Sequence, residues 1–443
     1  MQRHGRAGRR TNWLLAISLC LILLLPSGMS STLVPTDYHT DVKPENFYSA
    51  NGSGVNQEHP EWGQAGTLLG RVANSTHDPN ANWMGLSDLP NTRNISNIVC
   101  AEPYDIPDER GLSDFNWLWG QFITHEIDFT LTQNGRVGGT GTPEQANIQI
   151  SEDDPVMGAP GGSQLRFFRS LYMNVTDDQG VQTREHPNSI TTWIDGSSVY
   201  GSSVETSNWL RTFEGGELKV SPNPWGDLLP VAQDDDQTAP PMSFVGFSAD
   251  VRFIAGDSRA NEHIALMALH VLFIREHNRL AEEIAERNPD WSDEDIFQLA
   301  RKLVAAQIQA ITYEEFLPSL GVTLVPYSGY NSSINPEVTS SFATVAFRMG
   351  HSQTGDVFLR LDENREPIEN GVMDLFDGVL IDDYGWEHYK VDGKDYDIRF
   401  DRSRIEWACD CPAFKFRRKH KIRYCKHILE VQERNYKRRY NES

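Results

Sequence analysis

Two long helical patterns in succession constrain the fold of this 443-residue chain most strongly. The first covers about residues 261–287 and reads NEHIALMALHVLFIREHNRLAEEIAER, with apolar residues at helical spacing. The second covers about residues 292–316 and has Asp293 and Glu294 near its start, where acidic side chains favour a helix N-terminus. No internal repeat or convincing run of alternating strands accompanies them. The sequence therefore predicts a mainly α-helical body with long loops.

The charge of the chain is strongly negative and unevenly distributed. The formal net charge is −22, while 39% of the residues are hydrophobic and 10% are aromatic, which excludes wholesale disorder. Residues 1–30 contain arginine and no acid, and residues 398–443 are rich in Lys and Arg. The body between them is therefore very acidic, which argues against nucleic-acid binding by the whole chain.

The N-terminus is typical of a secretory signal, which we place at residues 1–30. Arginines precede the apolar run WLLAISLCLILLL, which stops at Pro26 and is short for a membrane span. We expect a secreted or extracellular protein; the alternative is an uncleaved segment that anchors the chain in a membrane. Six Asn-x-Ser/Thr sequons fit an exported glycoprotein, and they begin at Asn51, Asn74, Asn94, Asn174, Asn331 and Asn441.

Three separated apolar segments each carry a pair of polar residues. The pairs are Gln121 and His125 in WGQFITHEIDF, Arg259 and Glu262, and Arg348 and His351. Each pair alone has a structural explanation, because a single histidine on a helix usually belongs to the core. Together they supply an imidazole acid/base, an arginine and a second histidine as a ligand. This is the set of groups that breaks a peroxide bond at haem.

The body, roughly residues 35–377, resembles the animal-type haem peroxidases of the peroxidase–cyclooxygenase superfamily. Five motifs carry the resemblance in the family's order: WGQFITHEIDF (119–129), TTWIDGSSVYGS (191–202), AGDSRANE (255–262), HVLFIREHNRLA (270–281) and TVAFRMGHS (344–352). The first two are similar to the distal helix and the calcium loop. The next two together are similar to the central helix with the catalytic arginine, and the last is similar to the proximal helix.

The resemblance implies the roles of three catalytic residues. His125 would be the distal histidine, which takes a proton from hydrogen peroxide and returns it to the departing oxygen. Gln121 would hydrogen-bond the distal water or a halide. Arg259 would stabilise the charge that develops as the O–O bond breaks.

The resemblance also implies how haem b is bound. His351 matches the proximal iron ligand, and Arg348 would lie near the haem edge. Glu262 matches one position that forms an ester with haem, whereas Thr124 stands where the family often has the second ester-forming Asp. After residue 377 no match is found for the family segment whose asparagine holds the proximal histidine. We therefore expect the peroxidase domain, residues 31–378, to be C-terminally incomplete.

A calcium site is a further implication of the resemblance. The family's oxygen ligands map to five positions of this chain: Glu126, Thr191, Trp193 (its carbonyl), Asp195 and Ser197. Such oxygen ligands suit a hard cation. Glu126 replaces the family's Asp, so its longer side chain is expected to alter the geometry. Without the neighbouring motifs, TTWIDGSSVYG would be interpreted as a capped turn into a helix.

The C-terminal segment, residues 379–443, has a different texture. It starts with short alternating pieces such as KDYDIRF and ends with CDCPAFKFRRKHKIRYCKH, a Cys-x-Cys-x13-Cys-x-His spacing that resembles the SWIM zinc finger. Three thiolates and an imidazole suit tetrahedral zinc, and the ligands would be Cys409, Cys411, Cys425 and His427. The alternative is three incidental cysteines in a basic tail. Such modules bind protein or nucleic acid, and the basic residues here would allow weak binding of either.

The sequence therefore predicts a secreted haem peroxidase that reduces hydrogen peroxide, oxidises small organic donors or halides, and acts in the response to oxidative stress. One alternative is a non-catalytic peroxidase-like scaffold whose zinc finger binds protein or nucleic acid. Another is a fatty-acid dioxygenase of the same superfamily, which needs a radical-forming tyrosine such as Tyr313 or Tyr327. The oligomeric state is left open, since Cys100 would either be buried or link two chains.

Overall fold

The computed structural model describes residue 43 and residues 47–73, 89–101, 106–131, 145–374, 387–401 and 406–409, except 159, 177, 181, 225, 234, 244–252, 356, 363, 365 and 392–393. From residue 369 onward it describes only the backbone. The chain divides into two compact units: residues up to 229 with 255–257 and 269–355, and residues 230–254 and 258–268 with those from 356. Within the described part, no helix is long and apolar enough to cross a membrane.

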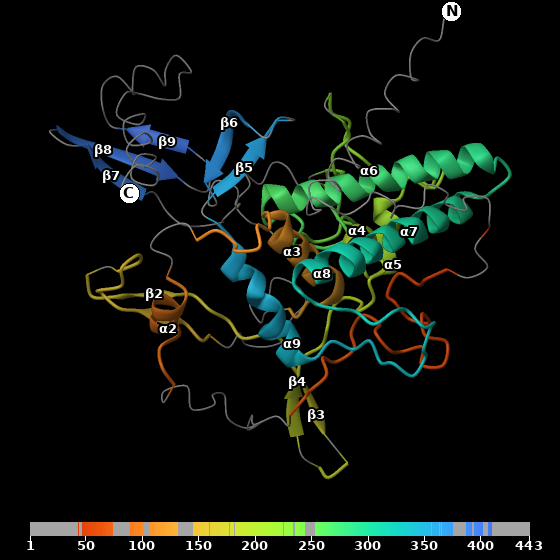
Figure 1. Cartoon of the computed structure of the whole chain (residues 1–443), viewed down its shortest axis with the longest axis horizontal. Helices are drawn as coiled ribbons and strands as arrows, with labels where there is room; N and C mark the ends of the chain where they lie inside the picture. The colour runs from red at the N-terminus through yellow and green to blue at the C-terminus, as the bar shows by residue number, and fades with distance from the viewer. Residues whose placement is uncertain are drawn as a thin grey trace, which may run out of the picture. The chain divides into compact units, whose positions relative to one another are not determined.

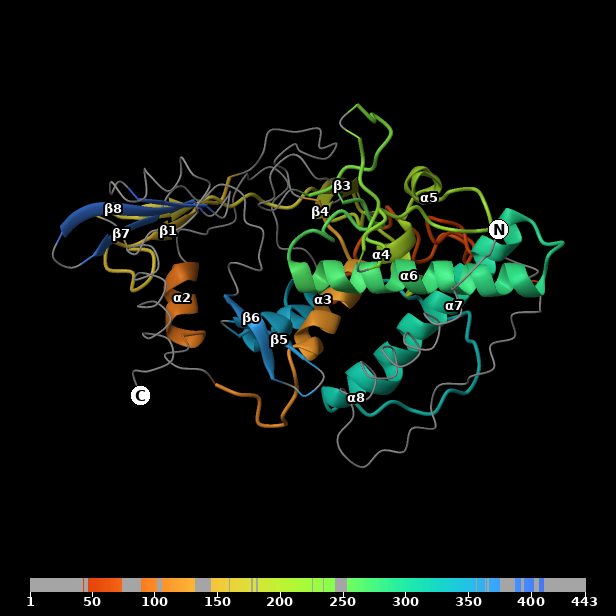
Figure 2. The same ribbon diagram turned by 90° about the horizontal axis from the view of Figure 1, so that it is seen from above.

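Long helices form the centre of the first unit. They are α3 (Phe115–Ile127), the part of α6 (Ile264–Arg287) from residue 269 onward, and α7 (Asp293–Ala310). Figure 1 shows α6 and α7 beside each other, and Figure 2 shows that α7 diverges from α6 toward α8. The Ser292 and Asp295 side chains form a capping box at the start of α7. α7 then continues into the π-helical turn η2 (Ile311–Phe316). Both long helices predicted from the sequence are therefore confirmed, the first beginning at Ile264.

An aromatic cluster holds α3 against α6 in the first unit. Trp119 and Phe122 of α3 pack with Phe273 of α6, and their ring centroids lie 5.3–6.0 Å apart. All three rings are buried. Removing each of them from water contributes roughly 1.5–3 kcal/mol. This packing fixes the orientation of α3 and thereby the positions of Gln121 and His125.

Short helices and hairpins complete the first unit. The helices are α2 (Thr92–Val99), α4 (Ser197–Tyr200), α5 (Val204–Leu210), α8 (Leu317–Ser319), α9 (Ser340–Thr344) and the 3-10 helix η3 (Ala346–Gln353). The antiparallel hairpins pair β1 (Ile148–Ile150) with β2 (Ser163–Leu165), and β3 (Met173–Thr176) with β4 (Gln182–Glu185). These strands were not predicted, because three or four residues are too few to show an alternating pattern.

The second unit contains the strands that follow the helical body. β5 (Val357–Leu361) pairs with β6 (Pro367–Asp374), and β7 (Glu387–Val391), β8 (Lys394–Asp401) and β9 (Glu406–Cys409) form a three-stranded antiparallel sheet. The segment KDYDIRF lies in β8, as its alternation indicates. Cys409 ends β9 and is described by its backbone alone, while Cys411, Cys425 and His427 lie outside the described residues. The zinc site therefore stays a prediction.

The segment expected to form the proximal helix is not one α-helix. α9 ends at Thr344, and the backbone at Val345 (φ −125°, ψ −66°) leaves the helical region before η3 begins. The Thr344 hydroxyl donates to the Ser340 carbonyl oxygen at 2.7 Å, a contact that competes with regular helix geometry. Two successive β-branched residues therefore interrupt the segment.

Candidate functional site

His125 lies buried on α3, one turn after the half-buried Gln121. Its Nδ1 is 3.8 Å from Oδ1 of Asp257, whose side chain is also buried. The backbone amide of Asp257 donates to the Ser198 carbonyl oxygen at 3.0 Å, which holds this acid beside α4. At this distance the two atoms form no hydrogen bond, but the negative charge of the carboxylate favours the tautomer with a proton on Nδ1, which leaves Nε2 as the base. Asp257 was not assigned a role from the sequence, although it lies within the AGDSRANE motif.

Glu126, the residue after His125, is fully buried and caps the N-terminus of α4. Its carboxylate accepts the backbone amides of Gly196, Ser197 (3.1 Å) and Ser198 (2.9 Å). The Ser197 hydroxyl in turn donates to the Glu126 carbonyl oxygen at 3.1 Å. Burial, together with the negative charge of Asp195, raises the pKa of Glu126 to about 7.

The remaining residues of the predicted calcium loop surround Asp195. Its Oδ1 accepts the Thr191 hydroxyl at 3.2 Å and the Ser197 amide at 3.1 Å, and the Thr191 hydroxyl is also 3.4 Å from the Trp193 carbonyl oxygen. The other carboxylate oxygen, Oδ2, is buried without a hydrogen bond. Burial raises the pKa of Asp195 to about 6. The structure therefore brings all five predicted cation ligands together.

This donor set fits a hard cation. It offers two carboxylates, hydroxyl groups and one carbonyl, all oxygen donors, and one buried carboxylate oxygen that lacks a hydrogen bond. Within the described residues, no three His, Cys, Asp or Glu side chains converge as they would at a transition-metal site. The loop chemistry thus favours calcium over zinc or iron.

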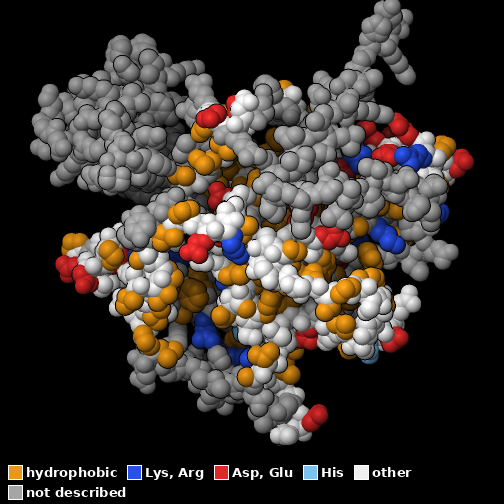
Figure 3. All heavy atoms as spheres, in the orientation of Figure 1, with side chains coloured by type: hydrophobic (Ala, Val, Ile, Leu, Met, Phe, Trp, Pro, Cys, Tyr) orange, Lys and Arg blue, Asp and Glu red, His pale blue; other side chains and the backbone are white. Residues whose placement is uncertain are grey.

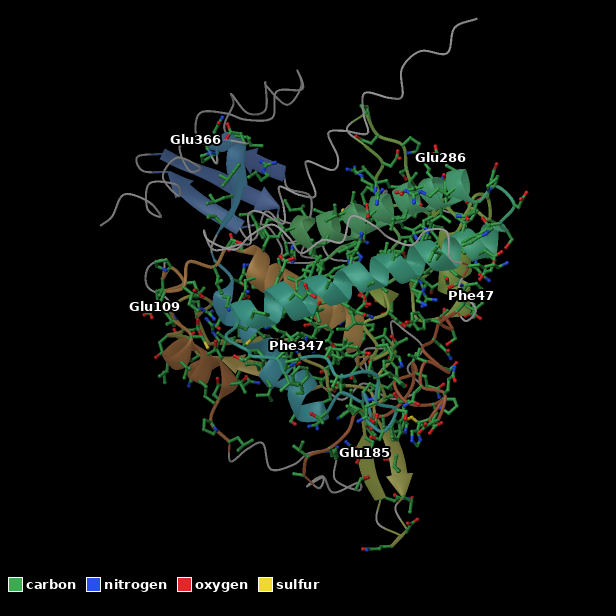
Figure 4. All side chains as sticks on the ribbon, turned by 45° about the vertical axis from the view of Figure 1, so that its right-hand side comes forward. Phe47, Glu109, Glu185, Glu286, Phe347 and Glu366 are labelled. Atoms are coloured by element: carbon green, nitrogen blue, oxygen red, sulfur yellow. The ribbon has the colours of Figure 1, made fainter. Side chains whose placement is uncertain are left out.

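His351 lies on η3 and is exposed. Its Nδ1 is 2.9 Å from the carbonyl oxygen of Arg348. Because a carbonyl oxygen only accepts, Nδ1 carries the proton and Nε2 keeps the lone pair that an iron ligand needs. The donor chemistry of His351 therefore fits haem iron. Figure 4 shows the labelled Phe347 on the same segment; its ring stacks on Phe342 with centroids 5.0 Å apart.

Arg348 connects η3 to the end of α3. Its Nη2 lies 3.0 Å from Oδ2 of Asp128, a carboxylate that is 3% exposed. A Cβ added at Gly350 would contact the Trp117 side chain at 3.8 Å, so η3 lies against α3. Figure 3 shows hydrophobic side chains on the visible face over α9 and η3, and Val345 and Met349 are among the exposed ones.

Arg259 and Glu262 belong to the second unit. Arg259 is 9% exposed, and its carbonyl oxygen accepts the Glu262 amide at 2.9 Å in a turn before α6. Asn261 steadies this turn by donating from Nδ2 to the Phe253 carbonyl oxygen at 2.9 Å. Glu262 is half-buried. The two predicted residues thus share one hydrogen-bonded turn that directly follows Asp257 and Ser258.

A family model for "Animal haem peroxidase" matches residues 47–391, which include all of these motifs. The chain belongs to the animal haem peroxidase family. Peroxinectin A of Dictyostelium discoideum is 31% identical over 334 residues, which cover 72% of this chain and 60% of that protein. Human lactoperoxidase is 34% identical over 307 residues, which cover 63% of this chain and 40% of that protein.

Solved structures agree with this assignment. Peroxidase A from Dictyostelium discoideum superimposes with a TM-score of 0.67 at 30% identity, over 76% of this chain and 65% of that one. An Arabidopsis thaliana fatty acid alpha-dioxygenase, at a TM-score of 0.55 and 20% identity, covers 75% of this chain and 52% of that one and shares the fold alone. The mainly helical peroxidase fold is confirmed. The chain spans 60% or less of the length of these curated relatives.

Proposed function

We propose that this member of the animal haem peroxidase family reduces hydrogen peroxide and oxidises small organic donors or halides. The observation that carries the proposal is the buried pair of His125 and Asp257, 3.8 Å apart, on the helix that also presents Gln121. With Asp257 on the Nδ1 side, Nε2 of His125 takes a proton from the peroxide and returns it to the departing oxygen. Gln121 orients water or a halide one turn away.

Haem b is the cofactor we propose, held through Nε2 of His351. When bound, it supplies the redox-active iron at which the O–O bond is cleaved. The positive charge of Arg259 stabilises negative charge on the departing oxygen. Glu262 is the residue proposed for an ester to haem, because Thr124 has no carboxyl group. Arg348 contributes through its carbonyl oxygen, which holds Nδ1 of His351.

The test is an optical absorption spectrum of the full chain supplied with haem, before and after addition of hydrogen peroxide. We expect a stoichiometric Soret band that shifts within seconds. His351→Ala should lose the band, whereas His186→Ala should keep it, because the described hydrogen bond of the His186 side chain is to the Leu171 carbonyl oxygen, at 2.9 Å. An unchanged band and unchanged turnover in His351→Ala would overturn the proposal.

Calcium is the second cofactor we propose, bound between Glu126 and Asp195. The buried Oδ2 of Asp195, which lacks a hydrogen bond, supports it. Thr191, Ser197 and the Trp193 carbonyl would complete the ligands. A bound divalent cation would offset the burial that raises the pKa values of both acids, and the charge of Asp195 that raises the pKa of Glu126 further. Chelation should therefore lower the unfolding temperature.

We also propose that the chain is exported, with a role in the response to oxidative stress. Sequon residues Asn94, Asn174 and Asn331 are exposed, as glycosylation requires. A mobility shift on treatment with an N-glycosidase tests this. The dioxygenase alternative gains no support, since Tyr313 and Tyr327 are 48% and 87% exposed. The zinc-finger scaffold would become the leading alternative if no Soret band formed.

A further inference from the structure

Among the described residues of the first unit, Arg301 of α7 has the largest fully buried side chain, at 2% exposure. Its Nη1 donates to the Tyr48 carbonyl oxygen at 3.0 Å, and its Nη2 donates to the Ser49 carbonyl oxygen at 3.4 Å. Figure 4 labels Phe47, the residue before Tyr48, near α7. A buried guanidinium is costly unless charges or dipoles compensate it. Two carbonyl oxygens alone leave its charge uncompensated.

The compensating charge belongs to Asp195 in the cation loop. Nη2 of Arg301 lies 3.8 Å from Oδ2 of Asp195, the carboxylate oxygen that lacks a hydrogen bond. This distance permits an ion pair but no hydrogen bond, so Oδ2 keeps its lone pairs for another ligand. Arg301 thus faces the side of Asp195 on which a cation would bind.

The segment that Arg301 contacts, residues 48–63, also packs against the cation loop, residues 191–197. The Trp193 indole nitrogen donates to the Trp62 carbonyl oxygen at 3.2 Å, and the Thr192 amide donates to the Gly63 carbonyl oxygen at 2.9 Å. A Cβ at Gly63 would lie 2.6 Å from the Trp193 indole nitrogen. Such close packing leaves no room for the segment and the loop to move independently.

We propose that Arg301 is a built-in counter-charge to Asp195, a positioning residue that holds the loop without calcium and weakens its affinity for calcium. The inference rests on the cation site of the proposed function. The positive guanidinium stabilises the ionised Asp195 in the cation-free protein. A cation on Oδ2 must sit close to that positive charge, and the repulsion opposes binding.

Two effects of opposite sign follow from removing the charge. Arg301→Met keeps an apolar stem but leaves two buried acids without the guanidinium, so the cation-free protein should unfold at a lower temperature. The same variant should bind calcium roughly tenfold more tightly, because the repulsion is gone. A merely structural arginine would lower stability equally with and without calcium.

The experiment is thermal unfolding of the full chain at pH 7.5, in a chelator and across a calcium titration. Wild type, Arg301→Met, Arg301→Lys and Arg211→Met are compared. Arg211 is a matched control, since it is buried and pairs with Asp293 and Glu294 of α7, away from the loop. We expect Arg301→Met to have the lowest unfolding temperature in chelator. Half of its calcium-dependent rise in unfolding temperature should occur at about one tenth of the calcium concentration that wild type needs.

Arg301→Lys, which retains the charge, and Arg211→Met should both require the wild-type calcium concentration. If Arg301→Met and wild type need the same calcium concentration for half of the rise in unfolding temperature, the inference is overturned but the cation site is not. No calcium response in either protein would overturn the cation site and the inference with it. Arg301→Gln, which retains a donor toward the carbonyl oxygens of residues 48–49, replaces Arg301→Met if that variant does not fold, with the same expectation.

Discussion

Nδ1 of His125 faces Oδ1 of Asp257 at 3.8 Å, and both side chains are buried. The two residues are far apart in sequence and meet because α3 and the segment before α6 both lie against α4. Gly256 makes this approach feasible, since a Cβ there would lie 2.4 Å from the Gly201 amide nitrogen. The acid that orients the histidine therefore depends on a glycine beside it.

Asp257→Asn tests the orienting role of this carboxylate. The substitution keeps the size and removes the charge that favours a proton on Nδ1, so Nε2 is less often the base. We expect haem binding to persist and the rate of the reaction with peroxide to fall by roughly 10²- to 10⁴-fold. Stopped-flow absorption measures the rate, and Asp108→Asn is the control, since the half-buried Asp108 pairs with the exposed Arg110. An unchanged rate and pH profile would show that Asp257 is structural only.

His277 makes the stability of the protein depend on pH. It lies buried between the Tyr200 hydroxyl and the Gly216 carbonyl oxygen, each 2.8 Å away. Burial lowers the pKa of His277 to about 4, below its unfolded value of about 6.5. At pH values between these two pKa values, His277 binds a proton in the unfolded chain but not in the folded chain.

The stabilisation from His277 is therefore complete above pH 6.5 and is lost as the pH falls toward 4, by at most about 3 kcal/mol. Urea unfolding of wild type and His277→Gln at several pH values from 7.5 to about 4.5 checks this. The variant should show a shallower loss of stability on acidification. His263, whose pKa burial also lowers to about 4, retains its own contribution in that variant. Parallel curves for the two proteins would contradict the prediction.

The sequence predicted the parts of the fold that local patterns determine. The helices at 261–287 and 292–316 have long apolar periodicity and acidic starts, and both form. The structure brings the loop residues Glu126 and Asp195 together, because one motif carries most of the loop and α3 carries the rest. The short hairpins and the interruption at Val345 leave too little periodicity to be seen.

Asp257 and Arg301 were missed for a different reason. Each acts through tertiary contacts with a residue on another element, and neither contact has a signature in local spacing. Arg301 has the appearance of an ordinary helix cation in the sequence LARKLVAA. The signal that could have identified it is its position among apolar residues at helical spacing, which places it on the buried face of α7.

Glu126→Gln should destabilise the protein because it changes an acceptor into a partial donor. The carboxylate accepts three backbone amides at the start of α4, and a carboxamide must turn its NH₂ group toward at least one of them. We expect a loss of roughly 1–3 kcal/mol in the free energy of unfolding at pH 8, measured in urea with a chelator present. Glu282→Gln, at an exposed position of α6, should change stability by less than about 0.5 kcal/mol. Equal effects of the two substitutions would contradict the capping role.

Arg348 holds two groups at once, and its replacement should separate their effects. Its guanidinium pairs with the buried Asp128 at the end of α3, and its carbonyl oxygen fixes Nδ1 of His351. Arg348→Ala keeps the carbonyl and removes the ion pair, so η3 should loosen from α3 while His351 keeps its tautomer. We expect haem still to bind, but to dissociate at least about tenfold faster, because roughly 1.4 kcal/mol of lost interaction corresponds to tenfold. Transfer of haem to a haem-scavenging apoprotein measures this dissociation rate.

Arg360→Ala provides the matched control, because Arg360 is an exposed arginine on β5. It should leave the haem dissociation rate unchanged. Arg348→Lys should fall between wild type and Arg348→Ala, since a lysine retains the charge but not the planar guanidinium. Equal dissociation rates for Arg348→Ala and wild type would show that the ion pair with Asp128 does not hold the haem-binding segment. Complete loss of haem binding would instead support a position of Arg348 near the haem edge, as the sequence resemblance implies.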